Sequence, residues 1–202
     1  MKPLFLTVSL TALLAATPVL AQNSKSETGT MPSTHATSNK QSADDQFIRH
    51  VTRANRAEVE LGQLAQQKSS SQDVKMLGQH LAADHEKSNQ QLAQIAQKEG
   101  VQPPSGIGRE NNALRDRLEK LNGQAFDRAF IQAQVEDHQK DIQYLQQAEN
   151  RVQDPSLKSY IQQTLPVMQQ HLQMAEQAEH QMSGSGSSSH SGSTGRSSGT
   201  SR

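Results

Sequence analysis

The sequence predicts an all-α protein built as a bundle of four long helices, with a short extra helix in the connection between the second and the third. Apolar residues recur every three or four positions over long stretches, which is the spacing of one helix face. Residues that favour helix starts and ends stand at the borders of these stretches. No stretch alternates apolar and polar residues as a half-buried strand does.

The first helix is expected from Asp44 to Lys68, with acidic residues in its first turn. Its apolar face has a three-four-three-four spacing, which is helical. The face consists of Phe47, Val51, Ala54, Leu61 and Ala65, and Glu58 interrupts it near the middle.

The second helix is expected to begin after Ser71, a residue suited to capping a helix N-terminus, and to stop at Gly100. Glycine there accepts the left-handed backbone conformation that commonly follows a helix. The apolar face reads Leu81, His85, Ser88, Leu92 and Ile95, so a histidine interrupts this helix as well.

The connection from Val101 to Asn122 contains prolines and glycines, and a short helix is expected within it from Arg109 to Leu121. About a dozen helical residues and ten extended ones span roughly 50 Å, enough to return along the length of a bundle. The connection therefore separates two helical pairs.

The last two long helices are expected from Gly123 to Asn150, and from a cap at Asp154 with Pro155 in the first helical position. Pro166 lies inside the final helix, which predicts a kink just before His171. Their apolar faces are Ile131, Val135, His138, Ile142 and Leu145, and Leu157, Ile161, Thr164, Met168, His171, Ala175 and Ala178.

The two ends of the chain differ in composition from the helical part, which we place at residues 43–182. Residues 1–21 resemble a cleavable secretory signal, with a lysine, a short apolar run and small residues before Gln22. Residues 22–42 and the Ser/Gly-rich residues 183–202 lack periodicity and are expected to be disordered. We therefore expect an exported protein with one helical domain.

The composition excludes several classes of protein. Equal numbers of basic and acidic residues (20 each), 3% aromatic residues and no Trp argue against a nucleic-acid surface. No segment of the mature chain approaches the roughly 20 apolar residues that a membrane span needs. Cysteine is absent, so an exported chain must be held by packing alone, or by packing together with a ligand or metal.

The most informative residues are the four that interrupt the apolar faces: Glu58, His85, His138 and His171. Each lies within about three residues of its expected helix midpoint, roughly 5 Å along the axis, so the four are expected at one level of the bundle. Imidazoles with a carboxylate form a familiar ligand set for one divalent ion such as Zn, Mn, Fe or Cu. Asp84, Asp137 and Asp141 are expected to hold the far ring nitrogens.

Two other interpretations remain open. A bundle can contain a hydrogen-bonded Glu/His layer that holds no metal and fixes helix register, provided that every buried polar group is paired. A hydrolase or oxidase would need a pocket open to solvent at the level of Glu58, because catalysis requires a vacant coordination position.

Five segments of the chain resemble the Domain of Unknown Function 4142 family of exported bacterial proteins. They are residues 57–65 (AEVELGQLA), 83–85 (ADH), 125–128 (AFDR), 137–141 (DHQKD) and 165–172 (LPVMQQHL). The resemblance implies a ferritin-like four-helix bundle with a long crossover, and a location in the periplasm or at the outer membrane of a Gram-negative bacterium. The family has no established activity.

The chain departs from the di-iron members of the ferritin-like superfamily, which use Glu-x-x-His on two helices. Ala82 and Met168 stand where those carboxylates would precede His85 and His171. A mononuclear site, or none, is therefore expected. We predict an envelope protein that binds one transition metal for metal handling or stress protection; the alternative is a metal-free scaffold with an envelope protein partner or a peripheral outer-membrane association.

Overall fold

The computed structural model describes residues 42–185, which form five helices and no strand, so the all-α prediction is confirmed within this range. The signal-like residues 1–21, the predicted linker up to residue 41 and residues 186–202 of the predicted tail lie outside the described residues. The helices are α1 (Ala43–Lys68), α2 (Gln72–Lys98), α3 (Arg109–Glu119), α4 (Gly123–Glu149) and α5 (Pro155–Ser185).

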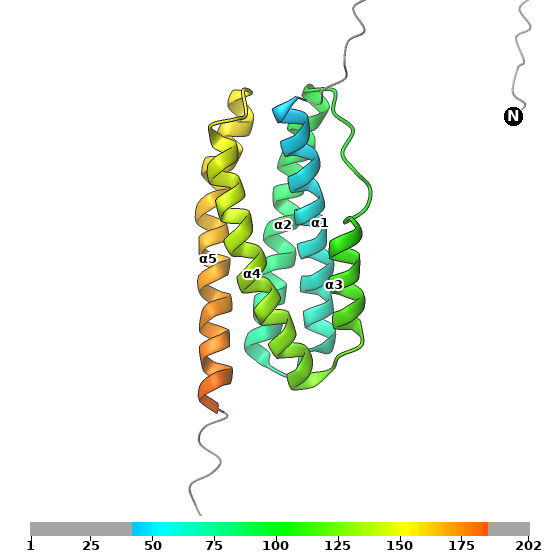
Figure 1. Ribbon diagram of the computed structural model, residues 1–202, viewed down its shortest axis with the longest axis vertical. Helices are drawn as coiled ribbons and strands as arrows, with labels where there is room; N and C mark the ends of the chain where they lie inside the picture. The colour runs from blue at the N-terminus through cyan, green and yellow to red at the C-terminus, as the bar shows by residue number, and fades with distance from the viewer. Residues whose placement is uncertain (1–41, 186–202) are drawn as a thin grey trace, which may run out of the picture. The chain divides into compact units, whose positions relative to one another are not determined.

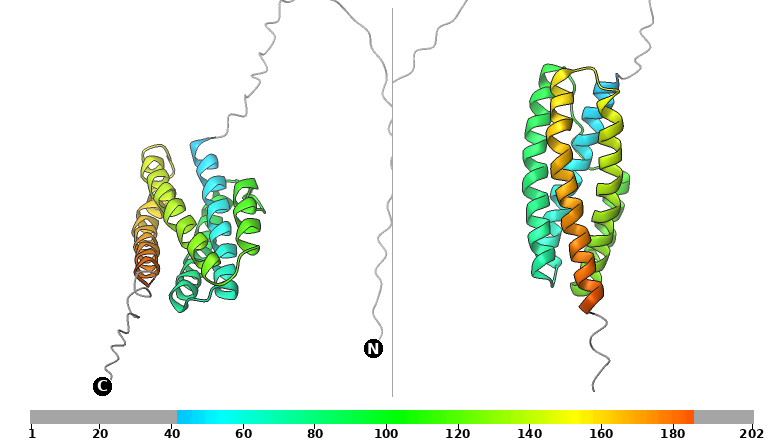
Figure 2. Two further views of the ribbon diagram at one scale, coloured as in Figure 1. Left: turned by 60° about the horizontal axis from the view of Figure 1, so that its bottom comes forward. Right: turned by 90° about the vertical axis from the view of Figure 1, so that its left-hand side faces the viewer.

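The four long helices form two antiparallel pairs, α1 with α2 and α4 with α5 (Figure 1). Contacts of α2 with α5 and of α1 with α4 bring the pairs together, and the long helices run side by side (Figure 2). The connection between α2 and α4 returns along α1, and its helix α3 packs on the outside of α1 (Figure 1). None of the helices in residues 42–185 combines the length and the apolar character that a membrane crossing requires.

The predicted caps are present. The Ser71 hydroxyl accepts a hydrogen bond from the backbone N–H of Val74 at 3.5 Å, and Asp154 accepts one from Leu157 at 2.9 Å. Gly100 has a φ of 67°, the left-handed conformation expected after α2. These local signals explain why the helix ends follow the sequence closely.

Three details differ from the sequence prediction or add to it. Helix α3 ends at Glu119, two residues before the predicted Leu121, and α5 continues to Ser185, three residues into the predicted tail. Helix α5 also remains helical through Pro166. Helix ends are the least certain part of any assignment from sequence, because terminal turns lack part of their hydrogen bonds.

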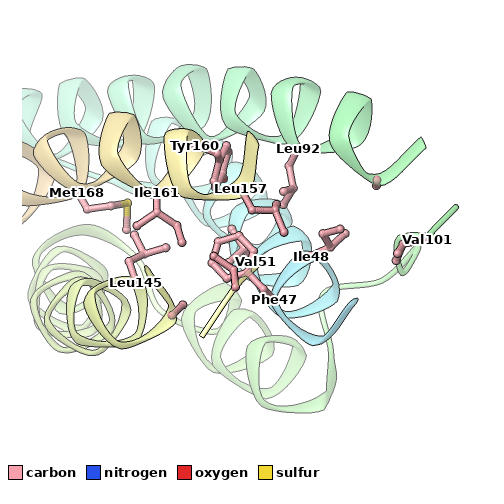
Figure 3. Close-up of a cluster of buried hydrophobic side chains, with 13 residues drawn as sticks. Phe47, Ile48, Val51, Leu92, Val101, Leu145, Leu157, Tyr160, Ile161 and Met168 are labelled. Atoms are coloured by element: carbon pink, nitrogen blue, oxygen red, sulfur yellow. The ribbon is translucent and has the colours of Figure 1, made fainter. Parts of the chain in front are cut away.

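The core consists of two apolar clusters, one toward each end of the bundle. The Phe47 cluster joins the start of α1, the end of α2, the end of α4 and the first half of α5 (Figure 3); its largest members include Phe47, Ile48, Leu92, Leu145, Leu157 and Ile161. The Phe126 cluster joins the other ends of these helices and α3; it includes Leu61, Leu77, Leu81, Leu118, Phe126, Phe130 and Ile131. The helix segments between the two clusters carry buried polar residues.

Helices α1 and α2 approach each other closely at two glycines. A Cβ atom added to Gly78 would lie 2.6 Å from the carbonyl oxygen of Gly62, and one added to Gly62 would overlap the carbonyl oxygen of Gly78. Such contacts involve backbone atoms, which cannot rotate away. The missing side chains therefore set the distance between the two helices.

We predict that Gly62→Ala lowers the free energy of unfolding by about 1–3 kcal/mol, because overpacking outweighs the gain in helix propensity. Urea unfolding followed by circular dichroism measures the change. Gly106→Ala is the matched control, since a Cβ there meets no atom within 4 Å. Equal stability of the two variants would contradict the proposed close approach.

Candidate metal centre

Three histidines from three helices meet between the two apolar clusters. His85 lies on α2, His138 on α4 and His171 on α5, and each is 1–2% exposed. One ring nitrogen of each lies within 4.8 Å of the corresponding nitrogens of the other two. The ring centroids are 5.4–5.8 Å apart. We call these residues the His triad.

The second ring nitrogen of each histidine is hydrogen-bonded to an oxygen atom. His85 Nδ1 lies 2.9 Å from Asn55 Oδ1, and His138 Nδ1 lies 3.0 Å from the backbone carbonyl of Gln134. His171 Nε2 lies 2.9 Å from Asp84 Oδ2. Carbonyl and carboxylate oxygens only accept, so the imidazole donates in each pair, and a neutral ring then carries its lone pair on the opposite nitrogen.

The orientation of the Asn55 amide follows from its other contacts. Its Nδ2 donates to the hydroxyl of Ser88 at 3.1 Å and to that of Tyr160 at 3.2 Å. Both amide hydrogens are therefore used, and Oδ1 faces His85. This small network, made by α1, α2 and α5, fixes the tautomer of His85.

The remaining nitrogen of each imidazole has no partner. His85 Nε2, His138 Nε2 and His171 Nδ1 are buried and make no hydrogen bond among the described residues. Burial lowers the pKa of His138 to about 3, lowers that of His85 well below 6.5, and lowers that of His171. The rings are therefore neutral near pH 7, and each carries an unpartnered lone pair in a low-dielectric layer where the three histidines offer ligand nitrogens within 4.8 Å of one another.

Three converging acceptors cannot satisfy one another, whereas a cation that accepts electron pairs satisfies all three. Zinc–imidazole bonds of about 2.0–2.1 Å would bring the nitrogens within about 3.5 Å of one another, so small inward shifts of the rings would complete the geometry. Nitrogen-only ligands suit Zn and Cu better than Mg, Ca or Mn, which prefer oxygen. The residues thus fit a transition-metal ion with a vacant coordination position.

Glu58 lies outside the group of atoms that converge in the triad. It is 4% exposed, its Oε2 has no hydrogen-bond partner, and its neighbours include Gln134 and Asp141. Burial, together with the charges of Asp141 and Asp137, raises the pKa of Glu58 to about 8. The residue of α1 that contacts the triad is Asn55, one helical turn before Glu58.

Of the three aspartates expected to hold imidazoles, Asp84 does so and the other two do not. Asp137 pairs with Lys140 at 3.4 Å, and both Asp137 and Asp141 line a cleft. Burial raises the pKa of Asp141 to about 7. The sequence prediction did not include Asn55 or the Gln134 carbonyl as partners of the triad. The signal for Asn55 was a polar residue beside the apolar face of α1. The signal for Gln134 was the fixed position of a helix carbonyl four residues before His138.

The cleft lies between α1, α4 and the connection between α2 and α4, and has a volume of ≈ 740 Å³. Arg49 and Arg56 hold the connection on α1 by donating to the carbonyls of Gln102, at 2.7 Å, and Ser105, at 3.1 Å. The cleft extends to Glu58, so a pocket exists at the level that the enzyme interpretation requires. The triad nitrogens themselves remain buried.

Comparison with known proteins gives a family and a fold. A family model described as Domain of unknown function (DUF4142) matches residues 29–178. The solved structure of CopM in the Cu(II)-bound form is 18% identical, with a TM-score of 0.60, and the match covers 69% of this chain and 97% of that one. CopM in the Cu(I)-bound form is 18% identical, with a TM-score of 0.59, and the match covers 70% of this chain and 99% of that one. CopM in the apo form is 17% identical, with a TM-score of 0.58, and the match covers 68% of this chain and 96% of that one.

At this level of identity the likeness to CopM shows the fold alone. The match extends over nearly the whole length of CopM and supports the helical-bundle assignment. No curated protein matches the sequence.

We predict that Glu58→Gln stabilises the metal-free protein increasingly as the pH rises. The folded-state pKa of about 8 exceeds the reference value of 4.5, so the wild type loses stability as the pH rises through this window. The variant has no such proton to lose, and its advantage should grow by on the order of 2–4 kcal/mol between pH 5 and pH 8. Urea unfolding in the presence of a chelator measures the stability difference between the variant and the wild type at each pH.

Glu86→Gln, which changes an exposed carboxyl on α2, is the matched control for this titration. The control should show no growing advantage over the same pH range. A constant difference between Glu58→Gln and the wild type from pH 5 to pH 8 would show that the pKa of Glu58 is not raised.

Proposed function

Because the chain belongs to the family Domain of unknown function (DUF4142), which has a helical bundle and no established activity, we propose a function from the site itself. The protein binds one transition-metal ion through His85, His138 and His171. The single observation that carries this proposal is the group of three buried histidines, which offer ligand nitrogens within 4.8 Å of one another and each have a ring nitrogen without a partner among the described residues.

The proposed cargo or cofactor is copper, with zinc as the second candidate. Three neutral imidazoles form a nitrogen-only ligand set, which suits these two metals. CopM, which has a similar fold, has been solved in Cu(II)-bound, Cu(I)-bound and Ag-bound forms. Mn and Fe, the other two ions considered from the sequence, fit less well, because Glu58 is not among the atoms grouped with the triad.

The proposed role is metal handling or stress protection in the periplasm or at the outer membrane. The signal-like residues 1–21 support export, and the low similarity of the histidine set to a di-iron centre argues against oxygen activation. The triad is closed to large molecules, which favours storage or transfer of an ion over catalysis on an organic substrate.

The competing interpretation, a structural Glu/His layer, makes a different prediction about stability. A structural layer contributes to the free energy of unfolding through hydrogen-bonded pairs. Replacing one member of a pair leaves its partner without a hydrogen bond and lowers the stability. The facing nitrogens of the triad are unpaired already, so their replacement by an apolar group removes an unsatisfied atom. Stability of the metal-free protein therefore separates the two interpretations.

We predict that His138→Leu abolishes stoichiometric binding of copper or zinc, while the metal-free variant is at least as stable as the wild type. The Gln134 carbonyl that His138 contacts keeps its helical hydrogen bond, so little is lost. Protein without a His tag is analysed for bound metal, and melting is followed with and without added ion. Wild type should gain about 2–3 kcal/mol at roughly 100 times the dissociation constant.

His180→Ala is the matched control, because His180 is exposed near the end of α5. This variant should bind and melt as the wild type does. Equal metal content in wild type and His138→Leu, or a strong loss of stability in the metal-free variant, would refute the proposed function.

A further inference from the structure

The unsatisfied polar layer extends beyond the His triad toward one side of the bundle. Among the described residues, six of the buried side-chain atoms without a hydrogen-bond partner belong to the triad, Gln134 and Glu58. Gln134 is fully buried; the nitrogen and oxygen of its side-chain amide have no partner at ordinary hydrogen-bond geometry, but the amide lies close enough to Glu58 to lower the pKa of that carboxyl. Its backbone carbonyl contacts His138, and its side chain neighbours Glu58. Gln134 thus links Glu58 to the triad.

Glu58 connects this layer to the cleft between α1, α4 and the connection between α2 and α4. It lines the cleft and is 4% exposed, with its unpartnered Oε2 buried. The cleft therefore ends on a carboxyl whose oxygen still needs a partner. A water molecule or a cation would supply one.

The charged residues that line the cleft are ordered by depth. Side chains of both signs are exposed at the rim: Arg53, Arg109, Glu110 and Lys140. Asp137 and Asp141 are half-buried farther in, and Glu58 is buried at the floor. The ionisable side chains inside the rim are all carboxyls, and Lys140 reaches Asp137 from the rim at 3.4 Å.

A second carboxylate reaches the triad from α2. This carboxylate is Asp84, whose side chain is 46% exposed. Its Oδ2 accepts from His171 Nε2, while the lone pair of His171 lies on Nδ1, across the ring. An ion at Asp84 would therefore be separated from the converging nitrogens by the imidazole itself.

We propose that this cleft is the route by which a metal cation reaches the triad, with Asp137 and Asp141 attracting the hydrated cation and Glu58 holding it at the floor. The three carboxyls form a transient cation site distinct from the triad. Their oxygens do not converge as closely as the triad nitrogens, which suits a hydrated ion in transit. This inference rests on the proposed function, because it requires the triad as the destination.

The experiment measures the rate and the equilibrium of Co²⁺ binding to the full-length protein at pH 7.5, by stopped-flow visible absorbance. Glu58→Gln and Asp141→Asn keep the shape of the side chains and remove a carboxyl from an acidic environment, so both variants should fold. We expect each to lower the association rate by at least about threefold at low salt, and the Asp141→Asn effect to shrink below about twofold near 0.5 M salt. The stoichiometry should stay that of the wild type.

The matched controls, Glu86→Gln and Asp73→Asn, remove one carboxyl each from α2, outside the cleft. They should bind Co²⁺ at the wild-type rate. Wild-type rates in the cleft variants, or equal slowing in the controls, would overturn the route while leaving the triad in place. Failure of wild-type protein to bind Co²⁺, Zn²⁺ or Cu²⁺ at equilibrium would overturn the proposed function and the route together.

Discussion

The constraint around which the structure is organised is a layer of three buried imidazoles between two apolar clusters, each with a ring nitrogen that has no partner among the described residues. The Phe47 and Phe126 clusters hold the four long helices together at both ends, so the layer between them cannot open without breaking a cluster. Apolar surroundings make each unpartnered nitrogen costly, because water is not available to replace the missing hydrogen bond. Because apolar clusters stabilise both ends of the bundle, the bundle can tolerate unsatisfied polar groups at its middle. A ligand that satisfied these groups would add the most to the free energy of unfolding there.

The imidazoles are held from outside the point where they converge. Each ring is oriented by an acceptor of a different kind: an amide oxygen of α1, a backbone carbonyl of α4 and a carboxylate of α2. Each hydrogen bond fixes both the rotation of the ring and the nitrogen that carries the lone pair, which is the usual effect of a group behind a metal ligand. The ring orientations are therefore fixed, and the proposed metal site would need only small inward shifts of the rings.

Much of the fold could be predicted from the sequence, because caps and apolar spacing act locally. Ser71, Gly100 and Asp154 mark helix ends by hydrogen bonds and backbone conformations that involve few neighbours. The three histidines could also be predicted, since each interrupts an apolar face. The sequence could not indicate which of Asn55 and Glu58 contacts the triad, because the two residues lie on nearly the same face of α1, about 4.5 Å apart along the axis. Ligand–metal distances must be correct within tenths of an ångström, whereas the helix boundaries inferred from a sequence are uncertain by a few residues.

The charge of the proposed ligands bears on which ion the layer would accept. Neutral imidazoles leave the full charge of the metal in a low-dielectric region, and the idealised cost of burying an ion rises with the square of its charge. A monovalent ion such as Cu(I) therefore bears about a quarter of the cost that a divalent ion bears in the same place. A divalent ion gains most from a nearby anion, and Glu58 becomes one only by losing the proton that its raised pKa retains. The separation of Glu58 from the triad would thus favour a monovalent ion in the proposed site, and it places the carboxyl where the cleft meets the layer.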